Sequence, residues 1–149
     1  MSFVTDPIAI LGESEAARLL EKKGLKVLEK NWRMGHLEID LIAEGKDAIV
    51  FAEVKARTTM YGDKKPEDYV DENKKRRMIA AGNAYAKQKR TEKGLRFDII
   101  GILVDAQTNE ITYRGHWENA FTPSNRIVTS GSHTGQWKWI HRTKTIRNK

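Results

Sequence analysis

The stretch HLEIDLIAEGKDAIVFAEVKA, residues 36–56, decides the fold because it reads as two neighbouring strands with unusual polar interruptions. Residues 36–43 and 48–56 are rich in Ile, Val, Leu and Phe, and β-branched and aromatic residues favour strands. The EGKD at 44–47 between them has the composition of a turn. The pattern predicts an antiparallel hairpin.

Four charged residues fall on matching positions of these two strands. Period-two alternation places Glu38 and Asp40 on one face of the first strand, and Glu53 and Lys55 on one face of the second. A turn centred on residues 45 and 46 makes Glu38 face Glu53, with Asp40 diagonal to Glu53 at a Cβ separation of roughly 7 Å. Three carboxylates then crowd one patch, and a bound cation would relieve their repulsion.

Such a patch favours a hard divalent cation. The chain has no cysteine, and its four histidines show no metal-ligand spacing. Mg²⁺ or Mn²⁺ is commonly held by one or two carboxylates together with water and substrate phosphate. Lys55, two residues beyond Glu53, would orient or help to deprotonate an attacking water. We therefore predict hydrolysis of phosphodiester bonds, the alternative being a salt-bridged strand surface without chemistry.

A helix predicted over residues 8–23, ending at Gly24, adds a further acid. Glu13 lies on its apolar stripe, where positions recur every three or four residues, so the carboxylate faces the core. Because a buried unpaired carboxylate is unfavourable, its partner is a metal, a bridging water, Lys55 or an arginine such as Arg33.

The remaining elements complete a single α/β domain. Residues 25–33 predict a strand before the hairpin, and the polar residues 58–68 predict a mobile loop that clamps the substrate. A second helix over 71–89 precedes strands at 96–104 and 110–114. The order is helix, three strands, helix, two strands.

Basic residues beside this cleft are candidates for binding a phosphate backbone. Lys74 continues the apolar stripe of the second helix, which directs its ammonium towards the site. The nucleic-acid-binding candidates are Arg57, Lys74, Arg76 and Arg77. The alternative is a solvated helix face.

The net charge of +7 is concentrated at the C-terminal end. Residues 122–149 contain six Lys or Arg and no acid, which leaves 21 basic and 20 acidic residues in 1–121. We assign 1–121 to the domain and 122–149 to a basic tail, for which disorder is one expectation. The N-terminal sequence has no secretory pattern and no segment has the length of a membrane span, so we expect a cytoplasmic protein.

An ordered series of blocks makes the interpretation more specific. The blocks are GESEAARLLEKKG at 12–24, KNWR at 30–33, EIDLIA at 38–43, FAEVKAR at 51–57, VDENKKRR at 70–77, RFDII at 96–100 and WENAF at 117–121. Together they resemble the YraN family of small bacterial proteins, which is grouped with the PD-(D/E)XK nuclease superfamily and resembles archaeal Holliday junction resolvases.

The resemblance implies a restriction-endonuclease-like fold, with a central mixed sheet flanked by helices. It implies that Glu13, Asp40, Glu53 and Lys55 occupy the catalytic positions, with Mg²⁺ (or Mn²⁺) held by Asp40 and Glu53 and supported by Glu13. The expected activity is metal-dependent endonucleolytic cleavage of DNA, duplex or branched. A homodimer is a further expectation, because resolving a junction requires two sites related by symmetry.

Two rival interpretations remain. In the first, the chain is a nucleic-acid-binding module that keeps a nuclease scaffold without cutting; its affinity would depend on salt and little on Mg²⁺. In the second, it is an assembly subunit whose site works only within a complex.

Overall fold

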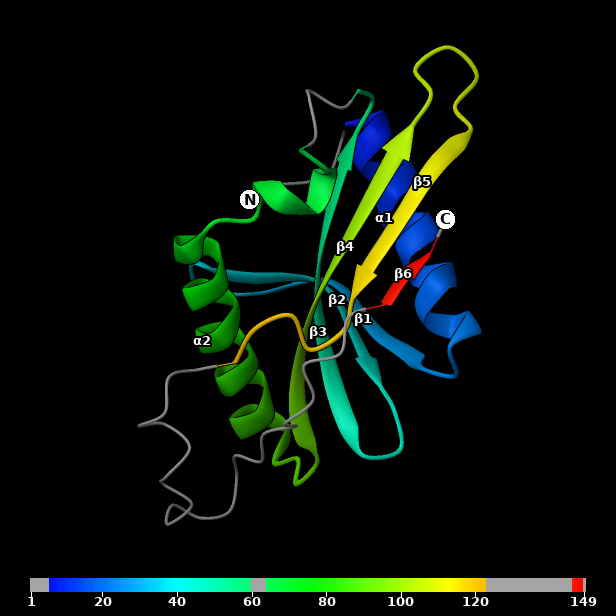
Figure 1. Ribbon diagram of the computed structural model, residues 1–149. Coiled ribbons are helices and arrows are strands. Elements are labelled where there is room, and N and C mark those ends of the chain that lie inside the picture. The colour runs from blue at the N-terminus through cyan, green and yellow to red at the C-terminus, as the bar shows by residue number, and fades with distance from the viewer. Residues whose placement is uncertain (1–5, 60–63, 123–145, 149) are drawn as a thin grey trace.

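A mixed β-sheet forms the centre of the structure, and one helix covers each of its faces (Figure 1). The computed structural model describes residues 6–59, 64–122 and 146–148. In chain order the elements are α1 (Pro7–Lys22), β1 (Lys26–Met34), β2 (Leu37–Glu44), β3 (Ala48–Arg57), the 3-10 helix η1 (Pro66–Tyr69), α2 (Glu72–Lys89), β4 (Gly94–Val104), β5 (Ile111–Trp117) and β6 (Ile146–Asn148).

The strand order follows the chain, β1-β2-β3-β4-β5-β6. Neighbouring strands are antiparallel except β3 and β4, which are parallel and are connected through α2. A parallel pair requires such a crossover, because the chain must return to the same edge before the next strand begins. The predicted α/β class, with a restriction-endonuclease-like mixed sheet between helices, is confirmed.

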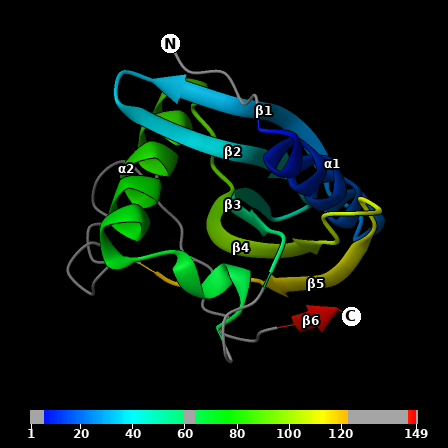
Figure 2. The same ribbon diagram turned by 90° about the horizontal axis from the view of Figure 1, so that it is seen from above.

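Two apolar cores lie on opposite faces of the sheet, one under α1 and one under α2; Figure 2 shows the two helices on these opposite sides. Alternate residues of β3 supply both cores: Val50 and Ala52 pack under α1, whereas Ile49 and Phe51 pack under α2. The central strands are therefore apolar on both faces. Any charged residue in β3 must be accommodated within this apolar layer.

Helix α1 approaches β3 unusually closely at Gly12. A Cβ added to Gly12 would lie 2.5 Å from the Cβ of Ala56, so no side chain fits between helix and strand. The helix begins after Asp6, whose side chain accepts a hydrogen bond from the backbone N of Ile8 at 3.0 Å. Glu13 follows Gly12 directly and is thereby placed against the sheet.

The hairpin of β2 and β3 has a different register from the prediction, which was wrong by two residues. Gly45 N donates to Ala48 O at 2.8 Å, and Glu44 pairs with Ile49. The turn residues inside that hydrogen bond are therefore 46 and 47, one position later than expected. A shift of two leaves each side chain on its face but changes its partner.

The segment predicted as a mobile loop over 58–68 is in part ordered against the sheet. Pro66–Tyr69 forms η1, in which Pro66 and Glu67 are buried. Residues 60–63 lie outside the described ranges, so the clamp itself stays a prediction.

At the other end of the chain, β6 pairs with β5. It belongs to the predicted basic tail, whose residues 123–145 and 149 are not described; the boundary after Phe121 stays a prediction. None of the helices in the described ranges is both long and apolar enough to cross a bilayer.

Candidate functional site

Two carboxylates from neighbouring strands meet where the ladder between β2 and β3 ends. The last pair is Leu41 with Ala52, and one further step along this register sets Asp40 opposite Glu53. Asp40 Oδ2 accepts a hydrogen bond from the backbone N of Val54 at 2.8 Å, so its side chain replaces a backbone partner. The carboxyl groups of Asp40 and Glu53 lie close enough for each to shift the pKa of the other.

The electrostatics of this pair are those of two acids held in an apolar layer. The pKa of Glu53 is raised to about 8, chiefly by burial and next by the charge of Asp40, while the charges of Lys74 and Lys55 partly offset both effects. Burial also raises the pKa of Asp40, against the lowering effects of the Val54 N–H and of Lys74. Acids with such raised pKa values, close together, are characteristic of functional sites.

One oxygen of Glu53 has no hydrogen bond. Only 5% of Glu53 is exposed, and within the described chain Oε1 is a buried oxygen without a hydrogen-bond partner. The ammonium of Lys74 on α2 lies 3.5 Å from this oxygen. A buried acceptor without a donor is unfavourable, and a divalent cation bound by Asp40 and Glu53 would satisfy it. The donor set therefore fits Mg²⁺ or Mn²⁺, which prefer oxygen ligands.

The protein supplies two close carboxylates to this candidate cation site. Across the described residues, no three His, Asp or Glu side chains come close enough to hold a metal ion together. This number suits Mg²⁺, which usually keeps several waters and uses one or two carboxylates with substrate phosphate.

Glu13 stands at the edge of the same group. It is half-buried on α1, and Asn31 Nδ2 donates to its Oε1 at 3.3 Å. Burial raises the pKa of Glu13 to about 6, and the charge of Asp40 raises it as well. Asn31 adopts a left-handed backbone conformation with φ 52°, which asparagine tolerates better than most residues. Glu13 therefore interacts electrostatically with Asp40 of the central pair.

The two lysines reach the acids from different elements. Lys55 lies two residues beyond Glu53 on β3 and is half-buried, and its charge lowers the pKa of Glu53. Lys74 extends from the first turn of α2 to within 3.5 Å of Glu53, as its helical spacing predicts. The site thus contains both signs of charge.

Comparison of the sequence with known protein families shows which family this chain belongs to. Residues 12–102 match the family described as Uncharacterised protein family UPF0102. This chain belongs to the UPF0102 family. The matched range contains Glu13, Asp40, Glu53, Lys55 and Lys74. The resemblance to the YraN family is confirmed.

Individual UPF0102 proteins are similar over most of their length. The protein of Phocaeicola vulgatus is 38% identical over 113 residues, which cover 75% of this chain and 89% of that protein. The protein of Parabacteroides distasonis is 40% identical over 110 residues, covering 74% and 88%. The protein of Caldanaerobacter subterraneus is 38% identical over 116 residues, covering 76% and 93%.

The other basic residues of the UPF0102 chain that were predicted to bind nucleic acid lie on β3 and α2. The Arg57 guanidinium lies 5.3 Å from the ring centroid of Tyr69, and Lys64 Nζ lies 4.0 Å from the same ring. Arg76 and Arg77 are exposed on α2, with Arg76 donating to the side chain of Asn73. These cations stand outside the carboxylate group.

Glu38 does not join the acids as the predicted register required. It is exposed and accepts a hydrogen bond from Arg33 Nη2 at 2.9 Å. The prediction of three crowded carboxylates from the hairpin is wrong, because the two-residue shift sets Asp40 rather than Glu38 opposite Glu53.

Sequence reasoning missed a buried acid beside the site. Glu67 Oε2 accepts hydrogen bonds from Tyr113 OH at 2.5 Å and Trp117 Nε1 at 2.9 Å. The carboxylate rests on Gly101 and Gly115, which pair across β4 and β5; a Cβ on Gly101 would lie 2.0 Å from Glu67 Oε1. Isolated glycines within two strands were the available signal, because they indicate close approach of another group.

A second missed group lies on the α1 face. Asp98 is fully buried and accepts hydrogen bonds from Arg96 Nη2 at 2.8 Å, His116 Nε2 at 2.8 Å and the backbone N of Asn119 at 2.9 Å. Lys23 Nζ donates to His116 Nδ1 at 2.9 Å, which sets the tautomer. Burial alone would raise the pKa of Asp98, but the bonds from His116 and Arg96 lower it below its usual value. This group ties α1 to β4 and β5.

Proposed function

We propose that this chain is a metal-dependent nuclease that hydrolyses phosphodiester bonds of DNA. The observation that carries the proposal is the close pairing of the half-buried Asp40 with the buried Glu53, one of whose carboxylate oxygens has no hydrogen-bond partner among the described residues. Two lysines and a third acid surround this contact, which is what hydrolysis of a charged diester needs: a cation site, a positioned water and compensation for charge.

Each residue has a separable role in this proposal. Asp40 and Glu53 hold Mg²⁺ or Mn²⁺, and Glu13 supports a water at the edge. A divalent cation held there would supply a more acidic water and would offset charge on the reacting phosphate. Lys55 orients the attacking water and stabilises the negative charge that develops in the transition state. Lys74 balances the acids before the cation binds and is then free to contact phosphate.

Basic residues outside the acids supply affinity for the substrate backbone. Arg57, Arg76 and Arg77 are exposed at the end of β3 and near the start of α2. Contacts of this kind depend on phosphate and not on base sequence, so they fit a protein that recognises the form of duplex or branched DNA.

The test is a cleavage assay with purified full-length protein. Linear duplex DNA, a four-way junction, single-stranded DNA and RNA are incubated with Mg²⁺, Mn²⁺ or EDTA. We expect cleavage of DNA only with a divalent ion. Glu53→Gln and Asp40→Asn should each reduce it by at least about 100-fold, because an interaction worth several kcal/mol in the transition state is lost.

Glu38→Gln is the matched control, because Glu38 lies on the same strand as Asp40 but is exposed and paired with Arg33. It should cleave at the rate of the unmodified protein. Cleavage that persists unchanged in Glu53→Gln would belong to a contaminant and would contradict the proposal.

A nucleic-acid-binding module without catalysis is the second candidate. It is favoured by the ammonium of Lys74, which already lies 3.5 Å from the unsatisfied oxygen of Glu53. If that ion pair is the final state of the site, DNA affinity falls with salt and is the same with Mg²⁺ and with EDTA. Metal titration of binding thus separates the two functions.

A further inference from the structure

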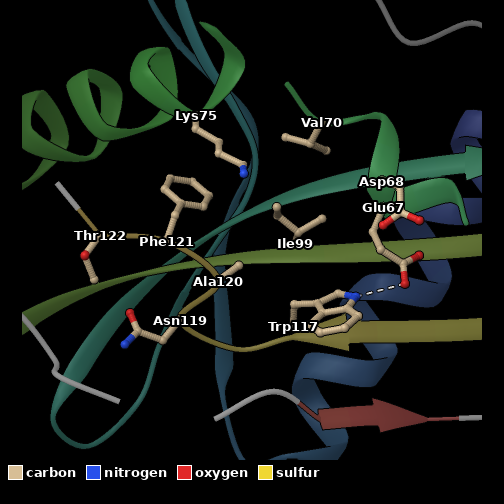
Figure 3. A pocket seen from close by; sticks show the side chains of 10 residues that line it. All are labelled: Glu67, Asp68, Val70, Lys75, Ile99, Trp117, Asn119, Ala120, Phe121 and Thr122. Carbon is tan, nitrogen blue, oxygen red and sulfur yellow. Dashed lines mark hydrogen bonds between the residues drawn. The ribbon is translucent and has the colours of Figure 1, made fainter. Parts of the chain in front are cut away.

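A pocket of about 500 Å³, whose lining Figure 3 shows, lies on the same face of the sheet as Glu53. The register places it there: Glu53 of β3 pairs with Ile99 of β4, and Ile99 pairs with Trp117 of β5. Paired residues on adjacent strands point to one face. Because Ile99 and Trp117 line the pocket, it begins one strand away from Glu53.

The lining combines flat apolar surfaces with a polar edge. Trp117 and Phe121 lie on different sides of the pocket with Ile99 between them (Figure 3). The hydrogen bond from Trp117 Nε1 to Glu67 holds the indole in place. Lys75, whose Nζ lies 5.8 Å from the centroid of the Phe121 ring, stands at the rim.

Consecutive lysines connect the pocket to the acids. Lys74 reaches Glu53, whereas Lys75, the next residue of α2, lines the pocket. A nucleic-acid strand whose phosphate lies at the acids would therefore pass two ammonium groups, with the pocket beside its neighbouring nucleotide.

We propose that this pocket receives one unpaired nucleobase next to the scissile phosphate. The inference rests on the proposed function and specifies its substrate: a strand with an unstacked base, as in a bulge, a junction or a single strand. A base offers apolar faces for the aromatic rings and a polar edge for the rim. Continuous duplex must first unstack a base, which is unfavourable, whereas an unpaired nucleotide enters readily.

The test measures binding in EDTA, where cleavage cannot interfere. Fluorescent duplexes are prepared with no bulge, with a single-nucleotide bulge, and with the same bulge lacking its base, and binding is followed by anisotropy. We expect the base-containing bulge to bind about tenfold more tightly than the other two, the effect of stacking one base on aromatic side chains.

Two substitutions of exposed alanines provide a matched comparison. Ala120 is exposed and lines the pocket, so Ala120→Leu should narrow it and abolish the tenfold preference. Ala106 is exposed in the turn between β4 and β5, and Ala106→Leu should keep the preference. Phe121→Ala should lose the tenfold preference and Phe121→Tyr should retain it. This pair distinguishes an effect of the aromatic ring on base binding from a general loss of stability.

Equal binding of the bulges with and without the base would overturn the inference, as would an intact preference in Ala120→Leu. A free mononucleotide that competes as well as the bulged duplex would also overturn it. Metal-dependent cleavage without base preference would contradict the proposed role of the pocket and support the proposed function. Base preference without cleavage in any metal would support the role of the pocket and contradict the proposed function.

Discussion

The proton of Glu53 couples folding to pH. Its pKa is raised by burial from 4.5 to about 8, so between these values the folded protein holds a proton that the unfolded chain has released. Stability present below pH 4.5 is then lost as pH rises towards 8, at no more than about 1.4 kcal/mol per pH unit for one proton. Glu13 and Asp40 act in the same direction, because their pKa values are also raised.

We expect Glu53→Gln to flatten this loss, because glutamine carries no titrating proton. Urea unfolding of the metal-free protein at several values between pH 5.5 and 8 measures it. Glu38→Gln, which alters an exposed acid of β2, should keep the original slope. If Glu53→Gln and the unmodified protein have the same slope, Glu53 is not the group that titrates.

Metal binding should release the same proton. Because a carboxylate must be ionised to hold a cation, the affinity for Mg²⁺ or Mn²⁺ is expected to rise by up to about tenfold per pH unit between pH 6 and 8. Calorimetry in two buffers of different ionisation enthalpy counts the released protons. Asp40→Asn should abolish the binding heat, and pH-independent affinity would argue against a site at Glu53.

Individual site residues were predictable because alternation along a strand survives an error in register. Asp40, Glu53 and Lys55 kept their faces although the hairpin pairing was wrong by two residues. The turn depends on one backbone hydrogen bond, from Gly45 to Ala48, which composition does not specify. Asn31 as the partner of Glu13 could not be predicted either, because it depends on a local left-handed backbone.

Among the elements, η1 packs against β4 and β5 at Gly101 and Gly115, where the lack of side chains leaves room for Glu67. Gly101→Ala would place a methyl 2.0 Å from Glu67 Oε1 and displace the helix. We expect a loss of about 1–3 kcal/mol in the free energy of unfolding, the usual range for overpacking. Urea denaturation measures it.

Glu67→Ala in the same chain provides the control, because it removes the carboxylate with which the methyl collides most closely and leaves only the backbone nitrogen of Glu67, 2.9 Å from the added Cβ. The double variant should be more stable than the sum of the two single effects predicts. Strictly additive losses would mean that Gly101 and Glu67 do not constrain each other.

The buried bridge from α1 to the sheet makes a separate prediction. His116→Ala removes the group between Lys23 and Asp98 and leaves the buried Asp98 with fewer donors. We expect a loss of about 2–4 kcal/mol in the free energy of unfolding. His36→Ala, at an exposed turn, should change stability by less than about 0.5 kcal/mol. Similar unfolding midpoints for both variants would contradict a structural role for His116.

Helices and strands were predictable from local periodicity, whereas the docking of η1 was not. The segment around Pro66 is polar and resembles a loop when read alone. Its position depends on glycines 34 and 48 residues beyond Glu67, at Gly101 and Gly115, and on donors in β5. Contacts between residues so distant in sequence leave no periodic pattern.

For the whole molecule, the charge of +7 predicts DNA binding that weakens with salt. Replacing Arg57, Arg76 and Arg77 together by alanine should lower the slope of log affinity against log salt by about 2–3, close to one per phosphate contact. A control of equal charge replaces Lys46, Lys87 and Lys89, which are exposed at the far end of α2 and in the β2–β3 turn. Equal slopes in both triple variants would show that net charge alone governs binding.

The close contact between Gly12 and Ala56 sets the distance between α1 and β3 at the candidate site. Glu13 and Lys55 are the chain neighbours of these two residues, so the positions of both charged side chains depend on the same contact. A methyl group added at Gly12 would push α1 away from β3 and so move Glu13 away from Asp40 without altering any charge. The spacing of the polar groups is thus adjustable from an entirely apolar position.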